Sequence, residues 1–323
     1  MKAPRKPTPS ELFFRGRPGD IRLGEWILPA QNLPPEQRKK HEVVIFGYPD
    51  DHGVKKNRGR AGAALGPEGI RRALYKMTVP ADRRWEDRFS AYDYGDAVIS
   101  SELAQTHIFA QALAAEVAQS GCTGLVFGGG HDFAAPTFLG FHAAAPKARW
   151  GLINVDPHLD TRELEGPAAH SGNPFRVILD SGKIKGRDFV EFGARASRNT
   201  RSSWEYCEAK GVKIHTLEAL RSKPTAVQAQ FRQTLTKLTK TARFVGVTID
   251  LDSCSDSEGS SAAPVLGFST WELCCFAAAA GANPKVRYLE LAEAAPGLDT
   301  ADRISRVAAE VAYAFLEARS RLR

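Results

Sequence analysis

The sequence predicts an α/β fold, a three-layer α/β/α sandwich with a mainly parallel central sheet. Short apolar runs alternate with longer segments of helical periodicity, the apolar runs are continuously hydrophobic, and polar clusters follow several of them. Alternation of strands and helices is typical of βαβ units. Continuous hydrophobicity indicates strands whose two faces are both covered.

The strands and helices are expected in a single domain that spans residues 41–323. The predicted strands are 41–49, 124–129, 150–156, 188–194, 243–250 and 286–293. The predicted helices are 66–77, 106–121, 202–211, 225–240 and 300–322. No internal repeat, linker or low-complexity segment interrupts this pattern, so we expect one domain rather than two.

Residues 1–40 are expected to form a basic, proline-rich arm on that domain. The segment holds nine Lys/Arg against four acids, so it carries five of the seven net positive charges, and it contains seven of the nineteen prolines. The rest of the chain is close to neutral and shows no RNP-like strand, helix-turn-helix or zinc finger. Composition therefore indicates no nucleic-acid partner.

The sequence also indicates that the protein has no membrane partner and is cytoplasmic. No apolar run approaches the roughly 20 residues needed to cross a bilayer, and the N-terminal segment lacks the apolar core of a signal peptide. The cysteines form no CxxC pair, so we expect reduced thiols. They are Cys122, Cys207, Cys254, Cys274 and Cys275.

Acids and histidines follow four of the predicted strands. They lie in the segments GGGHD (128–132), DPHLD (156–160), DLD (250–252) and ELAE (290–293). The carboxyl ends of parallel strands meet at one edge of a sheet, so these segments are expected to converge. Each motif alone is also compatible with a solvated turn, and it is their combination that predicts one site.

A cluster of this composition is expected to bind divalent cations. A buried carboxylate without a partner costs several kcal/mol, and a cation removes that cost. Oxygen donors with some imidazole and no thiolate fit Mn²⁺, and less selectively Fe²⁺, Co²⁺ or Zn²⁺, and the surplus of carboxylates indicates two ions. The candidate ligands are His131, Asp156, His158, Asp160, Asp250 and Asp252.

These motifs resemble those of the ureohydrolase family of arginase, agmatinase and formimidoylglutamase, in which they run GGxH, DAHxD and SxDxD. The resemblance extends from about residue 42 to 315 and implies an arginase-like fold, two Mn²⁺ per subunit and a homo-oligomer. It implies that His131, Asp156, Asp160 and Asp250 hold one ion and that Asp156, His158, Asp250 and Asp252 hold the other. It also implies that Glu293 orients the amidine of a small substrate during its hydrolysis.

Three further segments, 50–74, 159–179 and 192–212, resemble the formimidoylglutamase branch, and Ser171 stands where arginase and agmatinase usually carry histidine. The resemblance implies hydrolysis of N-formimino-L-glutamate to L-glutamate and formamide, in histidine degradation. Two substrate carboxylates favour arginine side chains, which bind carboxylates through two parallel hydrogen bonds. The candidate substrate contacts are Asn57, Arg60, Arg162, Ser171, Arg176 and Arg195, and His170 is either a general acid or a surface residue.

Two departures from the family pattern leave alternatives open. Pro157 replaces the alanine of DAHxD, and 257–264 replaces the usual APGVSAP segment beside the pocket. The alternatives are an agmatinase, arginase or guanidino-acid hydrolase that releases urea, a non-catalytic family member, and a one-metal relative of the deacetylases. The released product and the number of ions per chain distinguish them.

Overall fold

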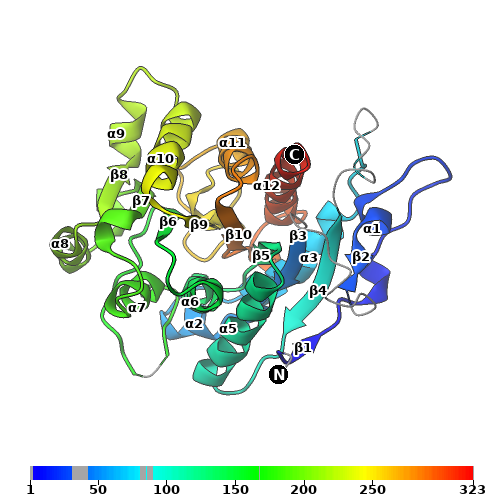
Figure 1. The fold of residues 1–323 in the computed structure, drawn as a ribbon, viewed down its shortest axis with the longest axis horizontal. Coiled ribbons are helices and arrows are strands. Elements are labelled where there is room, and N and C mark those ends of the chain that lie inside the picture. The colour runs from blue at the N-terminus through cyan, green and yellow to red at the C-terminus, as the bar shows by residue number, and fades with distance from the viewer. Residues whose placement is uncertain (1–2, 31–42, 81–84, 86–89, 167, 323) are drawn as a thin grey trace.

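The computed structural model describes residues 3–30, 43–80, 85, 90–166 and 168–322 and contains a ten-stranded sheet (Figure 1). The strand order is β1-β4-β3-β5-β10-β9-β6-β7-β8, and β2 also pairs with β4. The pairings are parallel except that of β1 with β4. The strands are β1 (Arg5–Lys6), β2 (Leu28–Pro29), β3 (Val43–Gly47), β4 (Ala91–Ala97), β5 (Thr123–Phe127), β6 (Trp150–Val155), β7 (Phe189–Ala194), β8 (Lys213–Thr216), β9 (Phe244–Asp250) and β10 (Val286–Ala292).

Helices cover both faces of the sheet, which confirms the predicted three-layer α/β fold. In β3, Val43 and Ile45 belong to one apolar core, while Val44 and Phe46 belong to the other, as expected for alternating side chains. The first core includes residues of α3 (Gly66–Leu74), α10 (Val227–Thr241), α11 (Thr270–Gly281) and α12 (Arg303–Arg319). The second includes residues of α5 (Leu103–Gln119), α6 (Ala134–Ala144) and α7 (Pro174–Asp180).

The structure contains all six predicted strands and all five predicted helices, with ends shifted by a few residues. The start of the first predicted strand, residues 41 and 42, lies outside the described part of the chain. The sequence did not predict β4, β8, α6 or α11. It also did not predict the short helices α1 (Leu23–Trp26), α2 (His52–Lys56) and α9 (Leu217–Arg221), or the seven-residue α7. The predicted helix 202–211 corresponds to α8 (Arg201–Lys210).

Strand β4 was missed because it carries two acids. Asp93 and Asp96 would be unfavourable in a buried strand, but the buried guanidinium of Arg71 on α3 binds both. Its Nε lies 2.9 Å from Oδ2 of Asp93, and its Nη1 lies 2.7 Å from Oδ1 of Asp96. The cation from the neighbouring layer therefore makes this strand possible.

The described part of the N-terminal segment, residues 3–30, packs against β4 and α5. Strands β1 and β2 both pair with β4. In addition, the backbone N–H of Ala3 and the guanidinium of Arg5 donate to the carboxylate of Glu116 on α5. Residues 31–42 lie outside the described part, so the division of the chain at residue 40 stays a prediction. Among the described residues, no helix has the length and apolar composition needed to span a bilayer.

Candidate metal centre and substrate pocket

The site forms at the carboxyl ends of four neighbouring strands, β5, β10, β9 and β6. The turn after β5 begins with three glycines, and a Cβ on Gly129 would lie 1.9 Å from the carbonyl oxygen of Asp50. Only glycine allows this approach. Asp160 and Glu293 have left-handed backbones, with φ of 43° and 64°, and such strained conformations concentrate at functional sites.

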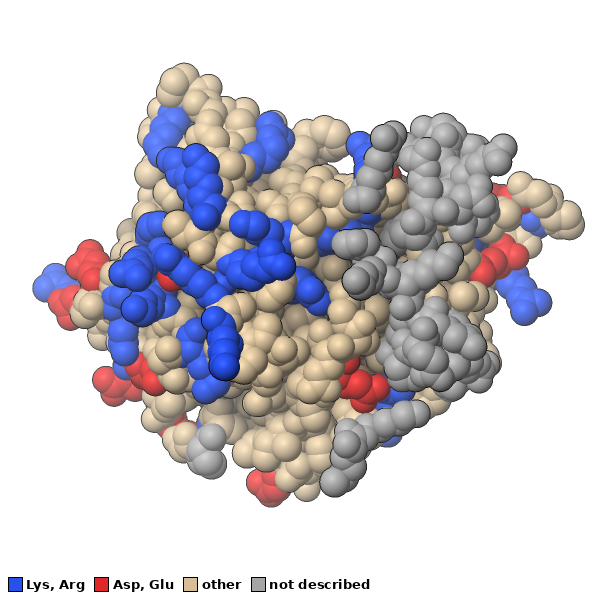
Figure 2. All heavy atoms as spheres, viewed as in Figure 1, with Lys and Arg blue, Asp and Glu red and all other residues tan. Residues whose placement is uncertain are grey.

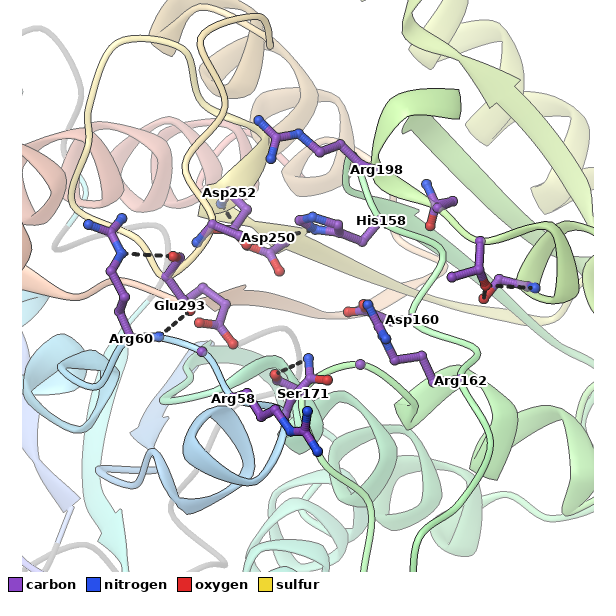
Figure 3. A pocket seen from close by; sticks show the side chains of 18 residues that line it. Arg58, Arg60, His158, Asp160, Arg162, Ser171, Arg198, Asp250, Asp252 and Glu293 are labelled. Atoms are coloured by element: carbon purple, nitrogen blue, oxygen red, sulfur yellow. Dashed lines mark hydrogen bonds and ion pairs between the residues drawn. The ribbon is translucent and has the colours of Figure 1, made fainter.

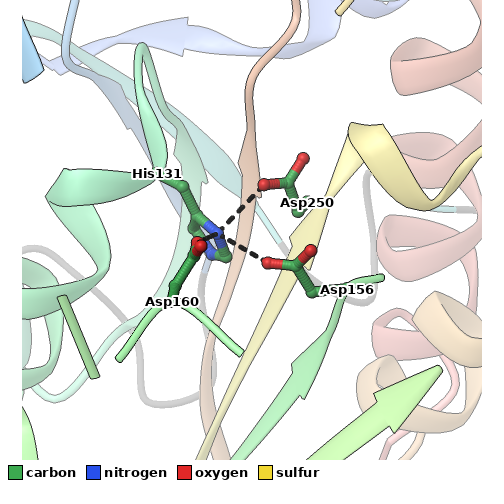
Figure 4. Close-up of side chains that lie close together, drawn as sticks. All are labelled: His131, Asp156, Asp160 and Asp250. Carbon is green, nitrogen blue, oxygen red and sulfur yellow. Dashed lines mark hydrogen bonds and ion pairs between the residues drawn. The ribbon is translucent and has the colours of Figure 1, made fainter. Parts of the chain in front are cut away.

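His131 stands at the centre of the first group of ligands (Figure 4). Its Nδ1 lies 3.1 Å from one carboxylate oxygen each of Asp156, Asp160 and Asp250. These four residues converge from the turns after β5 and β6 and from the last residue of β9, and their ligand atoms all lie within 4.8 Å of one another. The Nε2 atom of His131 lies 3.0 Å from the hydroxyl of Thr248, which fixes the orientation of the ring.

This arrangement fits a metal ion better than a hydrogen-bond network. A ring nitrogen carries at most one hydrogen, so it cannot donate to three carboxylates at once. Donors about 2.1 Å from an octahedral ion lie about 3 Å from each other, which matches the separations around His131. The donor set, one imidazole and three carboxylates, is one that Mn²⁺ accepts.

A second group lies beside the first and shares Asp156. The Nδ1 atom of His158 lies 3.2 Å from Oδ1 of Asp156 and 3.7 Å from Oδ2 of Asp252. Asp156 and Asp250 also fix the turns that follow them, because they accept the backbone N–H groups of His158 and Asp252 at 2.7 and 2.6 Å. The structure thus brings together all six predicted metal ligands.

Burial and mutual repulsion raise the pKa values of three acids in this cluster. Burial and the neighbouring Asp156 raise the pKa of Asp160 to about 6. Burial, Asp252 and Asp156 raise the pKa of Asp250 well above its usual range. Burial also raises the pKa of Glu293, with Asp250 and Asp252 adding to the effect. Divalent cations would favour the ionised form of each carboxylate.

Above these ligands lies a pocket of about 310 Å³ (Figure 3). His158, Asp160, Asp250, Asp252 and Glu293 form part of its wall. Four arginines surround the acids: Arg58, Arg60, Arg162 and Arg198. The wall is therefore negative where the ligands meet and positive around them.

Glu293 lies where an amidine-orienting acid would be useful. Its Oε1 accepts the backbone N–H of His131 at 2.8 Å, which ties it to the first group of ligands. Its Oε2 is buried and has no hydrogen-bond partner in the structure. One carboxylate oxygen thus remains for a cationic substrate group.

Four of the six predicted substrate contacts lie in the pocket wall: Asn57, Arg60, Arg162 and Ser171. Asn57 donates to the hydroxyl of Ser171 at 3.1 Å, and both side chains line the pocket. Arg60 also lines it, but its guanidinium donates to the carbonyl oxygens of Ser260 and Ser261 at 2.7 and 3.0 Å. Arg60 therefore also fixes the loop that departs from the family pattern.

The structure places Arg176, Arg195 and His170 outside the pocket wall. Arg176 donates to the carbonyl oxygen of Thr161 and lies over the ring of Tyr206. Arg195 pairs with Glu218 at 3.2 Å. His170 is buried, and its Nδ1 accepts the backbone N–H of Gly172 at 3.1 Å, so it shapes the turn that carries Ser171.

Arg58 and Arg198 also line the pocket, although the sequence did not predict either as a substrate contact. Neither side chain has an ion pair among the described residues, and the same is true of Arg162. Both lie in segments already singled out, 50–74 and 192–212, so the family resemblance marked the right loops. Which arginine of each loop faces the pocket depends on local backbone geometry, including the left-handed φ of 61° at Arg58.

Comparison with known proteins gives a family match over residues 41–317, to the arginase family. The chain belongs to the arginase family. It is 30% identical over 318 residues to a formimidoylglutamase of Klebsiella pneumoniae subsp. pneumoniae, covering 95% of this chain and 96% of that protein. It is 31% identical to a formimidoylglutamase of Nocardia farcinica, covering 84% and 85% of the two chains.

Solved structures of arginase-family proteins have the same fold. The crystal structure of Trypanosoma cruzi formiminoglutamase with Mn²⁺ superposes with a TM-score of 0.82 at 28% identity, covering 94% of this chain and all of that one. Formimidoylglutamase from Bacillus subtilis superposes with a TM-score of 0.84 at 24% identity, covering 94% and 93%, and supports the fold alone.

Proposed function

We propose that this arginase-family chain hydrolyses N-formimino-L-glutamate to L-glutamate and formamide with two bound Mn²⁺. The observation that carries the proposal is the pocket itself, in which arginines without ion pairs surround a buried cluster of acids and imidazoles. This pattern matches a substrate with one cationic amidinium and two carboxylates. The formimidoylglutamase relatives support the same substrate.

In this proposal the six candidate ligands would hold two ions. His131 and Asp160 would contact one ion, His158 and Asp252 the other, and Asp156 and Asp250 would contact both. When bound, the ions supply an activated water nucleophile at neutral pH and place it next to the amidine carbon. The relative crystallised with Mn²⁺ supports the identity of the ion.

The chain's own residues orient the substrate against that nucleophile. The free Oε2 of Glu293 would accept a hydrogen bond from the amidinium, while Arg58, Arg162 and Arg198 would bind the two carboxylates. Water adds its oxygen to the amidine carbon, the bond from that carbon to the glutamate nitrogen breaks, and the amine leaves with a proton. Because both ends of the substrate are bound, the attack of water on the amidine carbon becomes an effectively unimolecular step, which lowers its entropic cost.

Substrate profiling of the Mn²⁺-loaded protein tests the proposal. Formiminoglutamate should give formamide and glutamate in equal amounts, and arginine, agmatine and guanidinobutyrate should give at most traces of urea. Urea from any of these guanidines, together with no formamide from formiminoglutamate, would overturn the substrate assignment. Unchanged formiminoglutamate and no urea would overturn the hydrolase itself.

A urea-releasing hydrolase of the same family is the second candidate. The loop 257–264 favours it, because Arg60 holds this loop against the pocket and its sequence departs from the usual pattern. Agmatine has no carboxylate, however, and would leave the three arginines without anionic partners. We therefore place formiminoglutamate first, with a role in histidine degradation in the cytoplasm and a homo-oligomeric state as parts of the same proposal.

A further inference from the structure

Basic side chains gather at the amino edge of the sheet, on the side opposite the pocket. They lie at or just before the starts of five neighbouring strands, in the order β10, β9, β6, β7 and β8. Figure 2 shows Lys and Arg side chains massed on one face, over the region where Figure 1 places β6, β7 and β9. We name these residues the basic row: Lys147, Arg149, Lys183, Lys185, Arg187, Lys213, Arg243 and Arg287.

Direct contacts join the first part of the basic row. Arg243 and Arg287 both lie over the ring of Phe244, with their guanidinium carbons 5.4 and 5.2 Å from its centroid. The backbone N–H of Arg243 donates to the carbonyl oxygen of Arg149 at 2.8 Å. The cations of β10, β9 and β6 are therefore neighbours in space.

Two shallow hollows continue the basic row towards β7 and β8. Arg149, Lys183, Lys185 and Arg187 line the first, of about 210 Å³. Lys185 and Arg187 also line the second, of about 380 Å³, which reaches Lys210 at the end of α8. Lys213 follows on β8, opposite Val190 of β7.

Nearby acids leave most of this positive charge uncompensated. Asp188 is buried and pairs with Arg149, and Asp180 pairs with Lys210. Among the described residues, Lys183, Lys185 and Arg187 have no ion pair. Burial lowers the pKa of His142 and Lys183 lowers it further, as expected beside like charge.

The dimensions and composition of the basic row suit an extended polyanion. Neighbouring strands are about 4.8 Å apart, so five strand starts extend over about 19 Å. A duplex carries one negative charge per about 1.7 Å of its axis, so several phosphates would face a row of this length. The exposed large hydrophobic residues of the described chain belong to other segments, which disfavours insertion into a lipid surface.

We propose that the basic row binds the phosphodiester backbone of nucleic acid without reading the base sequence. Exposed lysine and arginine neutralise phosphates and release counterions, and this supplies non-specific affinity. The basic row lies on the opposite edge of the sheet from the metal ligands, so this binding is independent of the hydrolase function. The sequence indicated no nucleic-acid partner because each strand start contributes only one to three cations. Only the fold brings these cations together on one edge of the sheet.

Fluorescence anisotropy of the full chain with a labelled 20-nucleotide single-stranded RNA of mixed sequence tests the proposal. Binding should weaken with salt, with a slope of log affinity against log salt of about −0.7 for each neutralised phosphate. The triple variant Lys183→Glu/Lys185→Glu/Arg187→Glu should lose at least about tenfold in affinity and flatten that slope by about 2. Its thermal unfolding and formiminoglutamate hydrolysis should match those of the wild type, because the three side chains are exposed.

The matched control is Arg15→Glu/Arg17→Glu/Arg306→Glu, which removes the same charge from exposed positions outside the basic row. It should keep its RNA affinity within about threefold of the wild type. An equal loss in the control would overturn the localised site, and an absence of RNA binding at 50 mM salt, about the lowest useful concentration, would overturn the activity. Tighter binding to poly-L-glutamate or to phosphatidylserine vesicles than to RNA would overturn the assignment of the partner.

Discussion

The backbone N–H of Ala262 donates a hydrogen bond of 3.1 Å to Oδ1 of Asp252. The segment that carries Ala262 is held in turn by Arg60, whose guanidinium binds the carbonyl oxygens of Ser260 and Ser261. The backbone N–H of Arg60 also donates to the hydroxyl of Ser261 at 2.9 Å. Arg60 thus orients Asp252, a proposed metal ligand, through the altered loop 257–264.

We therefore expect Arg60→Ala to weaken Mn²⁺ binding by about tenfold or more, as loss of a group that orients a ligand commonly does. Titration calorimetry with Mn²⁺ measures this directly. Arg58→Ala is the matched control, because Arg58 lines the same pocket and should change the KM for formiminoglutamate rather than metal affinity. Wild-type Mn²⁺ affinity in Arg60→Ala would contradict the orienting role.

Asp156 and Asp250, which would contact both ions, should matter more for metal content than Asp160 and Asp252, which would each contact one. We expect the wild type to hold about two Mn²⁺ per chain, Asp252→Asn about one, and Asp250→Asn fewer than one, since Asp250 would contact both ions. Metal analysis after gel filtration gives these ratios. Asp180→Asn, at an exposed acid paired with Lys210, should retain about two. Equal metal content in Asp250→Asn and Asp180→Asn would argue against the ligand assignment.

Removing one pocket arginine should impair substrate binding more than metal binding. Arg162→Ala should raise the KM for formiminoglutamate about 10- to 100-fold, because a hydrogen bond to a charged group contributes about 1.5–3 kcal/mol. The Mn²⁺ content should stay at the wild-type value. Steady-state kinetics of Arg162→Ala and of Arg187→Ala, on the opposite edge of the sheet, make the comparison. A loss of Mn²⁺ from Arg162→Ala that parallels the rise in KM would contradict the proposed contact between Arg162 and a substrate carboxylate.

Metal binding should release protons and strengthen as pH rises. Burial and Asp156 raise the pKa of Asp160 to about 6. Burial favours the neutral imidazole of His158, but Asp156 and Asp252 outweigh it and raise the pKa of His158 to about 10. The metal-free site therefore holds a proton on His158 at pH 7 and also on Asp160 below about pH 6.

Each displaced proton should increase the apparent Mn²⁺ affinity about tenfold per pH unit. We expect the affinity to rise between about pH 5.5 and 8, more steeply below pH 6, where Asp160 also loses a proton. Calorimetry in two buffers of different ionisation enthalpy counts the protons released. An affinity that is independent of pH over this range would contradict the titration of these ligands.

The ion pair under β4 should be important for stability. Arg71→Met leaves the buried Asp93 without its cation, and breaking a buried pair in this way costs about 3–5 kcal/mol. The free energy of unfolding from urea titration measures the loss. Arg72→Met, one residue along and paired with Glu68 on the surface, should cost less than about 1 kcal/mol. Equal losses in the two variants would indicate an effect of the helix rather than of the buried charge.

Much of the fold, and the convergence of the six candidate metal ligands, could be predicted from the sequence. Apolar runs such as 243–250 form strands because burial on both faces needs continuous hydrophobicity. The acids that follow them lie close together because parallel strands end at one edge. In these cases the residue type and its position in the chain contain the necessary information.

The tertiary structure alone decided which side chains reach the pocket and where charge accumulates. Arg176 donates to the carbonyl oxygen of Thr161, and Arg195 pairs with Glu218, so neither lines the pocket. Arg58 and Arg198 line it instead. Arg71 compensates the charge of the two acids in β4, and residues at the starts of five strands form the basic row. Each of these outcomes depends on contacts between residues far apart in the sequence, because the direction of a side chain and the charge around it are set by its neighbours in space.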